Sequence, residues 1–461
     1  MSNQVPEFDN LKTELRGFPW LTASVLYTLS WGWSLLRPNT LYWDDWAYIF
    51  NRPKSYLNEI FVDTGLPPWR AIIDQELIAI GYWTIPVLTF LMYFASSVVI
   101  FLLAKQTSKF STPDLNILCI VFALAPVAYS RISLQMFGYT TSQFLFFLAW
   151  LILIKHKNKF VFFVSFTLFY WSFMTHSFLF FFVLPVLHFF ILNFVNLNEG
   201  KPSGTDITKL IFLLSAPVTY LTLRSFFWPP TEEYISYHRI TKDGVLLGGI
   251  VMGVGFLLSA GLLVIAREQK KSQFYLAIGP TIFSWALFPY FANKNLIDPK
   301  SIFAFRSDYG SRHLLLTPLG IALSVVALRE LLSNSCRKFL SFSLVAIFVL
   351  VNFFSGWQFF IDSHKKEQLI ELFRETPAIG ASSKVIFVDK TKHLNGKFSS
   401  YRNSELNSLI FLSGKNVQEI SGKSSCSDFP DAIILELNSS REFFDLITGS
   451  DLGLYFRVTS C

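Results

Sequence analysis

Long apolar stretches alternate with short polar breaks over the first 360 residues of the chain. A stretch of about 18 or more apolar residues can cross a hydrocarbon core of roughly 30 Å as a helix, because a helix satisfies its own backbone groups where no water is present. We count about eleven helical segments of this kind. They are residues 18–36, 82–104, 115–130, 142–154, 160–175, 177–194, 210–228, 245–266, 274–291, 314–332 and 339–360. The pattern predicts an α-helical polytopic membrane protein with about eleven transmembrane helices.

Lysine and arginine are distributed unevenly between alternate loops. One set of loops carries roughly 15 basic residues in about 65 positions, against about 11 in 100 for the other, and short basic loops remain on the cytoplasmic side. The first apolar stretch is too long and too rich in tryptophan to be a cleaved signal, so we interpret it as a retained helix. The N-terminus is therefore expected in the cytoplasm. An odd number of spans places the C-terminal region outside.

The last hundred residues have a different composition. Polar residues dominate there, and short apolar runs at 384–388, 408–412, 431–437 and 454–458 predict strands, whereas 367–373 and 441–447 predict helices. We therefore divide the chain into a membrane domain, 1–361, with a first outer loop at 37–81, and a small α/β extramembrane domain, 362–461. Cys426 and Cys461 both lie in this second domain, and the sequence leaves open whether they form a disulfide or stay as free thiols.

Composition agrees with this picture and narrows the function. Hydrophobic residues make up 52% of the chain and charged residues 15%, and there are 51 phenylalanines. The net charge of +7 needs no nucleic-acid partner, because much of it is the orientation signal in the loops. We find no phosphate-cradling GxxxxGK[ST] motif and no Cys/His metal pattern.

The first outer loop contains two adjacent carboxylates, Asp44 and Asp45, in the stretch LYWDDWAYIF. Adjacent acids near hydrocarbon repel each other unless a metal ion, a basic partner or an ionisable hydroxyl favours their charge. An ordinary solvated loop pair is the competing interpretation. Later in the loop, residues 69–80 place Trp69, Ile72 and Leu77 on one helical face, which predicts a helix in the membrane interface.

This layout resembles the GT-C superfamily of membrane glycosyltransferases, which use polyprenyl-phosphate sugars as donors. The resemblance rests on a long first outer loop that opens with adjacent acids, on interfacial helices, and on a many-span body followed by an outer C-terminal domain. Similar layouts occur in phage serotype-converting glucosyltransferases, aminoarabinose transferases and protein O-mannosyltransferases. The resemblance implies that Asp44 or Asp45 holds the catalytic position, without deciding between them.

Two kinds of chemistry fit this acid pair. A carboxylate can act as general base on an acceptor hydroxyl while its neighbour orients it, and a single displacement would invert the anomeric configuration. Alternatively, both carboxylates can hold Mg²⁺ or Mn²⁺, which would neutralise the phosphate of the donor. We weakly favour the base without a metal, so no cofactor is certain.

A lipid phosphate also requires cationic groups at the outer face, preferably arginine. The best candidates are Arg306, Arg312 and His313, which precede an apolar helix; if that helix begins near Gly310 or Ser311, its N-terminus would add to the site. The competing interpretation is that these arginines face lipid headgroups or pair with Asp308.

Weaker candidates for donor or acceptor contacts lie elsewhere at the expected outer face. They are Trp46, Tyr309, His176, Arg224, His238 and Arg239. For most of them, an interfacial anchor or a solvated loop charge is the commoner role. Arg131, in another outer turn, is interpreted as structural.

The leading hypothesis is a bacterial inner-membrane glycosyltransferase that moves a sugar from undecaprenyl phosphate to a surface glycan, such as a lipid-linked O-antigen within lipopolysaccharide synthesis. An O-antigen polymerase or ligase is one alternative, although those proteins tend to place their large outer loop late in the chain. A transporter or flippase for lipid-linked sugars is another. Transporters commonly place polar groups near the midplane, whereas the spans here carry almost no ionisable residues.

Overall fold

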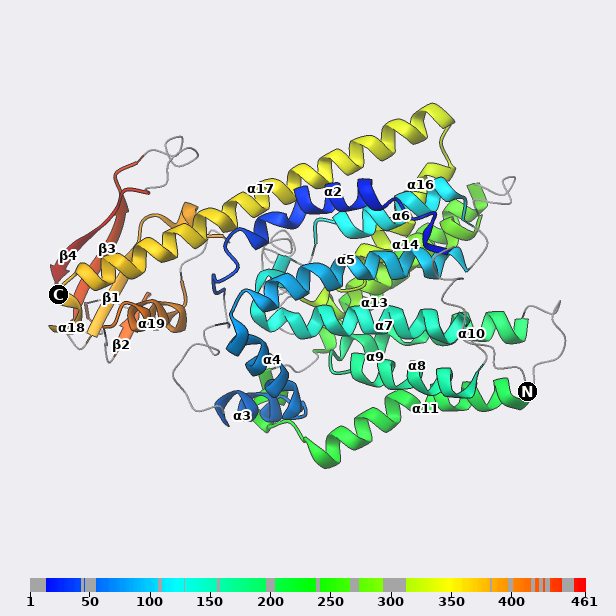
Figure 1. Ribbon diagram of the computed structural model, residues 1–461, viewed down its shortest axis with the longest axis horizontal. Helices are drawn as coiled ribbons and strands as arrows, with labels where there is room; N and C mark the ends of the chain where they lie inside the picture. Colours follow the sequence, from blue (N-terminus) through cyan, green and yellow to red (C-terminus); the bar gives the residue numbers. More distant parts are fainter. Residues whose placement is uncertain are drawn as a thin grey trace.

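The computed structural model shows a bundle of helices with a small sheet domain at one end (Figure 1). It describes residues 14–42, 45, 55–106, 110–127, 129–155, 158–195, 204–237, 241–265, 273–292, 312–381, 384–396, 401–415, 419–422, 426–427, 432–441 and 452–461. All structural statements below concern these residues.

The bundle is built from the apolar stretches that the sequence predicts. Its helices are α2 (Trp20–Trp31), α5 (Thr84–Lys105), α6 (Thr112–Leu124), α7 (Phe137–Lys155), α8 (Lys159–Ser172), α9 (Ser177–Phe181), α10 (Val183–Phe190), α11 (Gly204–Phe227), α13 (Lys242–Ile265), α14 (Gln273–Ala292), α16 (Thr317–Glu330) and α17 (Asn334–Glu375). Each of the eleven predicted segments overlaps at least one of these helices, so the class of helical membrane protein is supported.

The structure does not confirm the number of spans that the sequence suggests, within the residues it describes. Six helical segments are long and apolar enough to cross a membrane, namely 84–105, 134–155, 177–194, 204–227, 242–264 and 334–375. The helices α2, α6, α8 and α16 have 12, 13, 14 and 14 residues. At 1.5 Å per residue they rise by about 18 to 21 Å, which is less than a hydrocarbon core. The structure therefore supports six candidate spans and does not establish eleven.

One end of the bundle gathers basic residues that the sequence assigns to the cytoplasmic loops. The Nζ atom of Lys155 lies 2.6 Å from a carboxylate oxygen of Glu14, and Lys105 donates to the Glu14 carbonyl over 2.7 Å. Nearby helices are joined in the same way, because Arg329 pairs with Asp114 at 3.0 Å. The Arg329–Asp114 pair is buried, whereas the Lys155–Glu14 pair is partly exposed and therefore contributes less.

The opposite end carries the sheet domain, and α17 connects the two. This helix of 42 residues runs without a break across the expected domain boundary at 361/362 (Figure 1). Shorter elements complete this end: the 3₁₀ turns η1 (Gly32–Leu35), η3 (Tyr129–Ile132) and η4 (Leu134–Met136), and the helices α3 (Ser55–Asp63), α4 (Trp69–Ile80) and α12 (Glu232–Tyr237). The expected boundary thus lies inside a continuous helix, which fixes the orientation of the sheet domain relative to the bundle.

The sheet has four strands in the order β2-β1-β3-β4. Its strands are β1 (Lys384–Asp389), β2 (Glu419–Ser421), β3 (Ile433–Ser439) and β4 (Leu454–Ser460), and α19 (Asn403–Leu412) connects β1 to β2. β1 is parallel to β2 and β3, whereas β4 is antiparallel to β3. A helix between two parallel strands is the usual crossover, because parallel strands cannot be joined by a tight turn. The predicted α/β character of this domain agrees with the structure.

Two details of this domain differ from the sequence prediction. Residues 408–412 were expected to form a strand but belong to α19, whose start is capped: a carboxylate oxygen of Glu405 accepts a hydrogen bond from the Arg402 N–H over 2.8 Å. β2 was not predicted, because three residues are too few to show an alternating pattern. The expected helix at 441–447 lies almost wholly outside the described residues.

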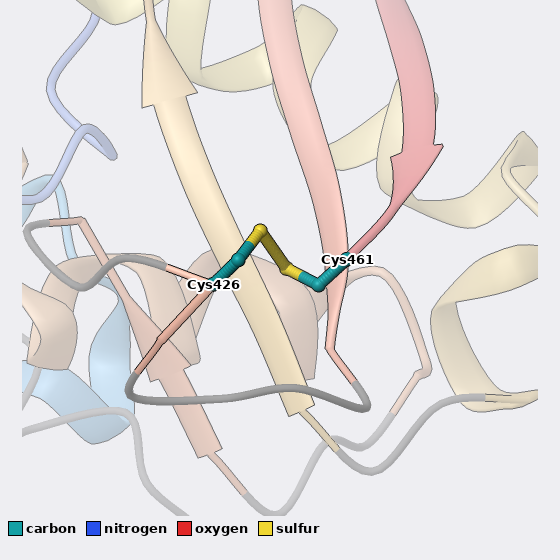
Figure 2. Close-up of a disulfide and its surroundings, with 2 residues drawn as sticks. All are labelled: Cys426 and Cys461. Atoms are coloured by element: carbon teal, nitrogen blue, oxygen red, sulfur yellow. A yellow bond between two sulfur atoms is a disulfide. The ribbon is translucent and has the colours of Figure 1, made fainter.

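A disulfide closes the sheet domain. Cys426 and Cys461 are bonded, with their Cα atoms 5.3 Å apart (Figure 2), within the usual range for a disulfide. The Cys461 N–H also donates to the Ala432 carbonyl over 3.0 Å, so the chain end is held against the start of β3. The alternative of two free thiols is therefore wrong.

The hydrophobic core of the sheet domain continues into the membrane domain. Leu369 and Phe373 of α17 pack with buried side chains of β1, β3 and α19, and the same cluster includes Leu41, Leu134 and Phe137 from the bundle. Shared burial of this kind excludes water between the two parts and resists their separation. The sheet domain is consequently fixed on the end of the bundle that carries the first outer loop.

Candidate functional site

Asp45 is the described member of the acid pair, and its side chain is fully buried. Oδ1 accepts a hydrogen bond from the Ser133 hydroxyl at 2.5 Å and another from the Gln135 N–H at 3.2 Å. Oδ2 accepts from the N–H of Tyr42 at 3.0 Å. Both oxygens are thus occupied, and the carboxylate fastens the first outer loop to the turn between η3 and η4.

Burial changes the acidity of this group. Removal from water raises the pKa of Asp45 to about 6, although the hydrogen bonds from Ser133 and from the backbone N–H groups of Leu134, Tyr42 and Gln135 act in the opposite direction. A carboxyl group with such a pKa changes charge near neutral pH, as groups at functional sites often do. A buried structural carboxylate can show the same shift, so the geometry of its partners has to decide its role.

The start of α7 is where several outer elements meet. Gly138 lies against the guanidinium of Arg70, where a Cβ atom on this glycine would come within 2.4 Å of Nη2. Arg70 is paired with Asp74 of the same helix, and both are buried. The helix α4 was predicted correctly, but its charged face is the one turned into the protein, whereas Ile72 and Ile80 are exposed.

Two arginines that the sequence suggests as candidates for ligand contacts, Arg224 and Arg312, both influence the pKa of one tyrosine, Tyr234. Burial raises the pKa of Tyr234 in α12 to about 12, and the positive charges of Arg224 and Arg312 oppose this rise. Arg224 also donates to the carbonyls of Thr64 and Gly65, at 3.0 Å in each case. Its guanidinium therefore positions the turn between α3 and α4, which supports the structural interpretation of this residue.

The helix that follows Arg312 begins later than the phosphate hypothesis needs. α16 starts at Thr317, with Leu316 as its N-cap residue and proline in its first turn, and not near residue 310. Arg312 and His313 lie ahead of the helix and are half-buried. The N-terminus of α16 therefore lies five residues beyond Arg312, while Gly310, Ser311 and Arg306 lie outside the described residues, so the phosphate site stays a prediction.

The other predicted residues are separated or undescribed. His176 precedes α9, and its ring lies 6.4 Å from that of Tyr220. Residues of the predicted site that lie outside the described part of the chain are Asp44, Trp46, His238, Arg239, Arg306 and Tyr309. Within the described part, no three His, Cys, Asp or Glu side chains come together as a metal site.

Sequence reasoning missed a groove of about 640 Å³ along the start of the first outer loop. Residues 36–41 of the first outer loop form one wall, and α17 and α19 form the other. The lining side chains are Leu36, Arg37, Pro38, Asn39, Thr40, Leu41, Phe360, Ser363, Lys366, Glu367, Ile370, Leu409 and Leu412. Arg37 pairs with Glu367, and its guanidinium lies 4.9 Å from the centre of the Phe360 ring. A volume of this size and a mixed polar and apolar lining are typical of sites for small ligands.

Lys366 ties the groove to Asp45. Its Nζ atom is 2.9 Å from Oδ2 of Asp362 and donates to the Leu41 carbonyl over 3.0 Å. The next residue, Tyr42, donates its N–H to Asp45 and its hydroxyl to the Phe359 carbonyl over 3.2 Å. Asp362 is four residues away on the same helix, but Leu41 lies 325 residues away in the chain, so no local sequence signal could have found the contact of this lysine with the outer loop.

Comparison with known proteins adds no family to this description. No protein-family model matches the chain, and no curated protein matches it significantly.

Proposed function

We propose that the protein is a membrane glycosyltransferase that moves one sugar from a polyprenyl-phosphate donor to a glycan acceptor. One observation carries this proposal: the buried carboxylate of Asp45 accepts a hydrogen bond from Tyr42, which directly follows the loop residues 36–41 that line a groove of about 640 Å³. A buried, anchored acid in the loop that forms one wall of a ligand-sized groove fits chemistry at the interface.

In this proposal the two acids have different roles. The oxygens of Asp45 already accept three hydrogen bonds, so this residue orients the loop. Asp44 takes the proton of the acceptor hydroxyl as general base. The hydroxyl oxygen then attacks the anomeric carbon, the bond between that carbon and the phosphate oxygen breaks, and polyprenyl phosphate leaves with the bonding electrons. A single displacement inverts the anomeric configuration.

The occupied oxygens of Asp45 also favour base catalysis over a shared metal. A divalent cation held between the two acids would have to share a carboxylate that already accepts hydrogen bonds from Ser133, Gln135 and Tyr42. If Mg²⁺ or Mn²⁺ does bind, it would supply charge neutralisation for the leaving phosphate. Arg312 and Arg306 would contribute positive charge to the phosphate, since the guanidinium of Arg224 is already used by two carbonyls.

The groove suits the acceptor. Its loop wall carries Arg37, Asn39 and Thr40, which can bond sugar hydroxyls, and the leucines of α19 offer an apolar surface. An acceptor with both characters, such as a lipid-linked O-antigen, matches this lining. The sheet domain then forms part of the acceptor site instead of serving as a separate module.

The distribution of charge favours an enzyme over a transporter. Among the described residues, ion pairs lie at the two ends of the bundle, as with Glu14–Lys155 at one end and Asp362–Lys366 at the other. Transport sites tend to lie near the midplane on broken helices. A location in the bacterial inner membrane, with a cytoplasmic N-terminus and a periplasmic sheet domain, agrees with the disulfide and with the basic end of the bundle.

The test is sugar transfer by the purified protein in lipid, with polyprenyl-phosphate hexoses as donors. Asp44→Asn is expected to lower the transfer rate by about 10²- to 10⁴-fold, the usual contribution of a general base. Asp45→Asn should lower it less. Asp243→Asn is the matched control, because Asp243 is an exposed acid at the same end of the bundle. Transfer at the wild-type rate by both Asp44→Asn and Asp45→Asn would refute the assignment.

A further inference from the structure

Arg131 is a buried arginine in close contact with two aromatic rings. It belongs to η3 and only 8% of it is exposed. The carbon at the centre of its guanidinium lies 3.3 Å from the centre of the Trp31 ring and 3.7 Å from that of Tyr93. Both contacts are close enough for a cation–π interaction, which stabilises the buried cation.

The terminal nitrogens of this guanidinium have no hydrogen-bond acceptor within the described part of the chain. Both Nη1 and Nη2 are buried and unpartnered. The hydroxyl of Tyr93 also interacts with the guanidinium and donates its own hydrogen bond to the Phe122 carbonyl at 3.3 Å. A buried cation of this kind is costly unless an anion or several acceptors meet it.

Two further unpartnered donors line the same cavity. The indole Nε1 of Trp31 and the hydroxyl of Thr89 are both buried and, among described residues, have no hydrogen-bond partner. Trp31, Thr89 and Arg131 come from three separate elements, α2, α5 and η3, and all three line one small cavity. An indole N–H and a guanidinium can only donate, and a hydroxyl can donate, so the three side chains together suit an anion.

The small size of the cavity limits which anions can bind there. Its volume is about 20 Å³, enough for roughly one water-sized particle. A phosphate or sulfate group is several times larger, so it cannot enter without displacing the rings. A monatomic anion is only slightly larger than water and can receive donors from several directions. We propose that Arg131, Trp31 and Thr89 form a binding site for chloride.

A chloride ion here would stabilise the turn that holds Asp45. Arg131 is two residues from Ser133, whose hydroxyl donates to the Asp45 carboxylate. Neutralising the buried guanidinium favours the closed arrangement of α2, α5 and η3 over one in which the arginine reaches water. The site is independent of the proposed transfer reaction, because none of its three residues is assigned to donor or acceptor.

The test measures thermal unfolding of the full-length protein in detergent at constant ionic strength, with chloride replaced stepwise by gluconate. Chloride and bromide should raise the apparent Tm in a saturable way. Iodide should raise it less because the ion is larger. Sulfate and phosphate should give the same apparent Tm as gluconate. Arg131→Gln should abolish the halide dependence. Arg224→Gln is the matched control and should retain it, since the donors of Arg224 are used by the carbonyls of Thr64 and Gly65.

A milder variant keeps the test decisive if Arg131→Gln does not fold. Thr89→Val removes only the hydroxyl and should weaken the apparent chloride affinity by about fivefold, the effect of one neutral hydrogen bond. In bromide, an anomalous diffraction peak should lie within hydrogen-bond distance of the Arg131 guanidinium. Equal Tm values in chloride and gluconate, a larger effect of phosphate than of chloride, or halide dependence that survives in Arg131→Gln would each overturn the proposal.

Discussion

The Nζ atom of Lys366 donates a hydrogen bond to the carbonyl oxygen of Leu41 over 3.0 Å, and this contact joins residues that lie 325 positions apart in the chain. Lys366 belongs to the helix that enters the sheet domain, and Leu41 precedes the backbone N–H that holds Asp45. The position of the sheet domain is therefore coupled to the position of the acid pair.

Lys366→Met should disturb this coupling. The substitution leaves the carboxylate of Asp362 buried without its cation and the Leu41 carbonyl without its donor, at a cost of about 3 to 5 kcal/mol of unfolding free energy. Amide hydrogen exchange should become faster at Tyr42 and Asp45, and sugar transfer should fall mainly through kcat. Lys390→Met, at an exposed lysine of the sheet domain, is the control and should leave both unchanged. Unchanged exchange in Lys366→Met would contradict the coupling.

The neighbouring Lys365 should matter for the sheet domain itself. Its Nζ atom lies 3.1 and 2.8 Å from the two carboxylate oxygens of Asp389 and 2.6 Å from Oδ1 of Asn395. Burial alone raises the pKa of Asp389, but the charge and hydrogen bonds of Lys365 bring it below its usual range. Lys365→Met should therefore cost about 3 to 5 kcal/mol, because one charge is left buried.

A double-mutant cycle separates this pair from general damage to the helix. Lys365→Met combined with Asp389→Leu removes both charges and should restore much of the lost stability, measured by denaturant unfolding of the sheet domain. Lys392→Met replaces an exposed lysine nearby and should have little effect. If the double variant is as unstable as the sum of the single variants, the two residues do not act as a pair.

The disulfide should contribute measurably to the sheet domain. It closes a loop of 35 residues, and in the chain-entropy view such a crosslink stabilises the folded state by about 4 kcal/mol. Cys461→Ser, or reduction with dithiothreitol, should lower the denaturant midpoint of this domain. Cys336→Ser is the control, because Cys336 is a free, exposed cysteine at the start of α17. Equal midpoints for reduced and oxidised protein would contradict this expectation.

The sequence predicted the elements of the fold better than their partners. Apolar length located the long helices of the membrane domain but not the short helices α3 and α12, and helical periodicity located α4, because both signals are local. The strand expected at 408–412 failed for a physical reason: an apolar run of five residues fits a strand or a buried helix equally well, and the cap formed by Glu405 decided for the helix. The start of the segment expected at 314–332 lies within three residues of the start of α16 at Thr317, where proline stands in the first turn.

The candidate site could be predicted only in part. Adjacent acids near a membrane end singled out Asp45, but its burial follows from Ser133, 88 positions away, which no local pattern indicates. Arg131 was interpreted as structural because a single arginine in a turn has no signature. Its role depends on Trp31 and Thr89, which the fold brings to the same cavity.

The ionisation of Asp45 should make stability depend on pH. Its pKa is about 6 in the folded protein and near 3.9 in an unfolded chain, so between these values the folded state holds a proton that the unfolded state has released. The contribution of Asp45 to the free energy of unfolding is thus greatest below about pH 4 and is lost as the pH rises to about 6. The total change amounts to roughly 3 kcal/mol.

Thermal unfolding of the wild type and of Asp45→Asn at pH 4 to 7 measures this contribution, because the uncharged amide cannot titrate. The stability of wild type relative to Asp45→Asn should fall across this range, whereas the same comparison with Asp243→Asn, an exposed acid, should not reproduce that fall. A constant difference from Asp45→Asn would show that the carboxylate is not desolvated in the folded protein.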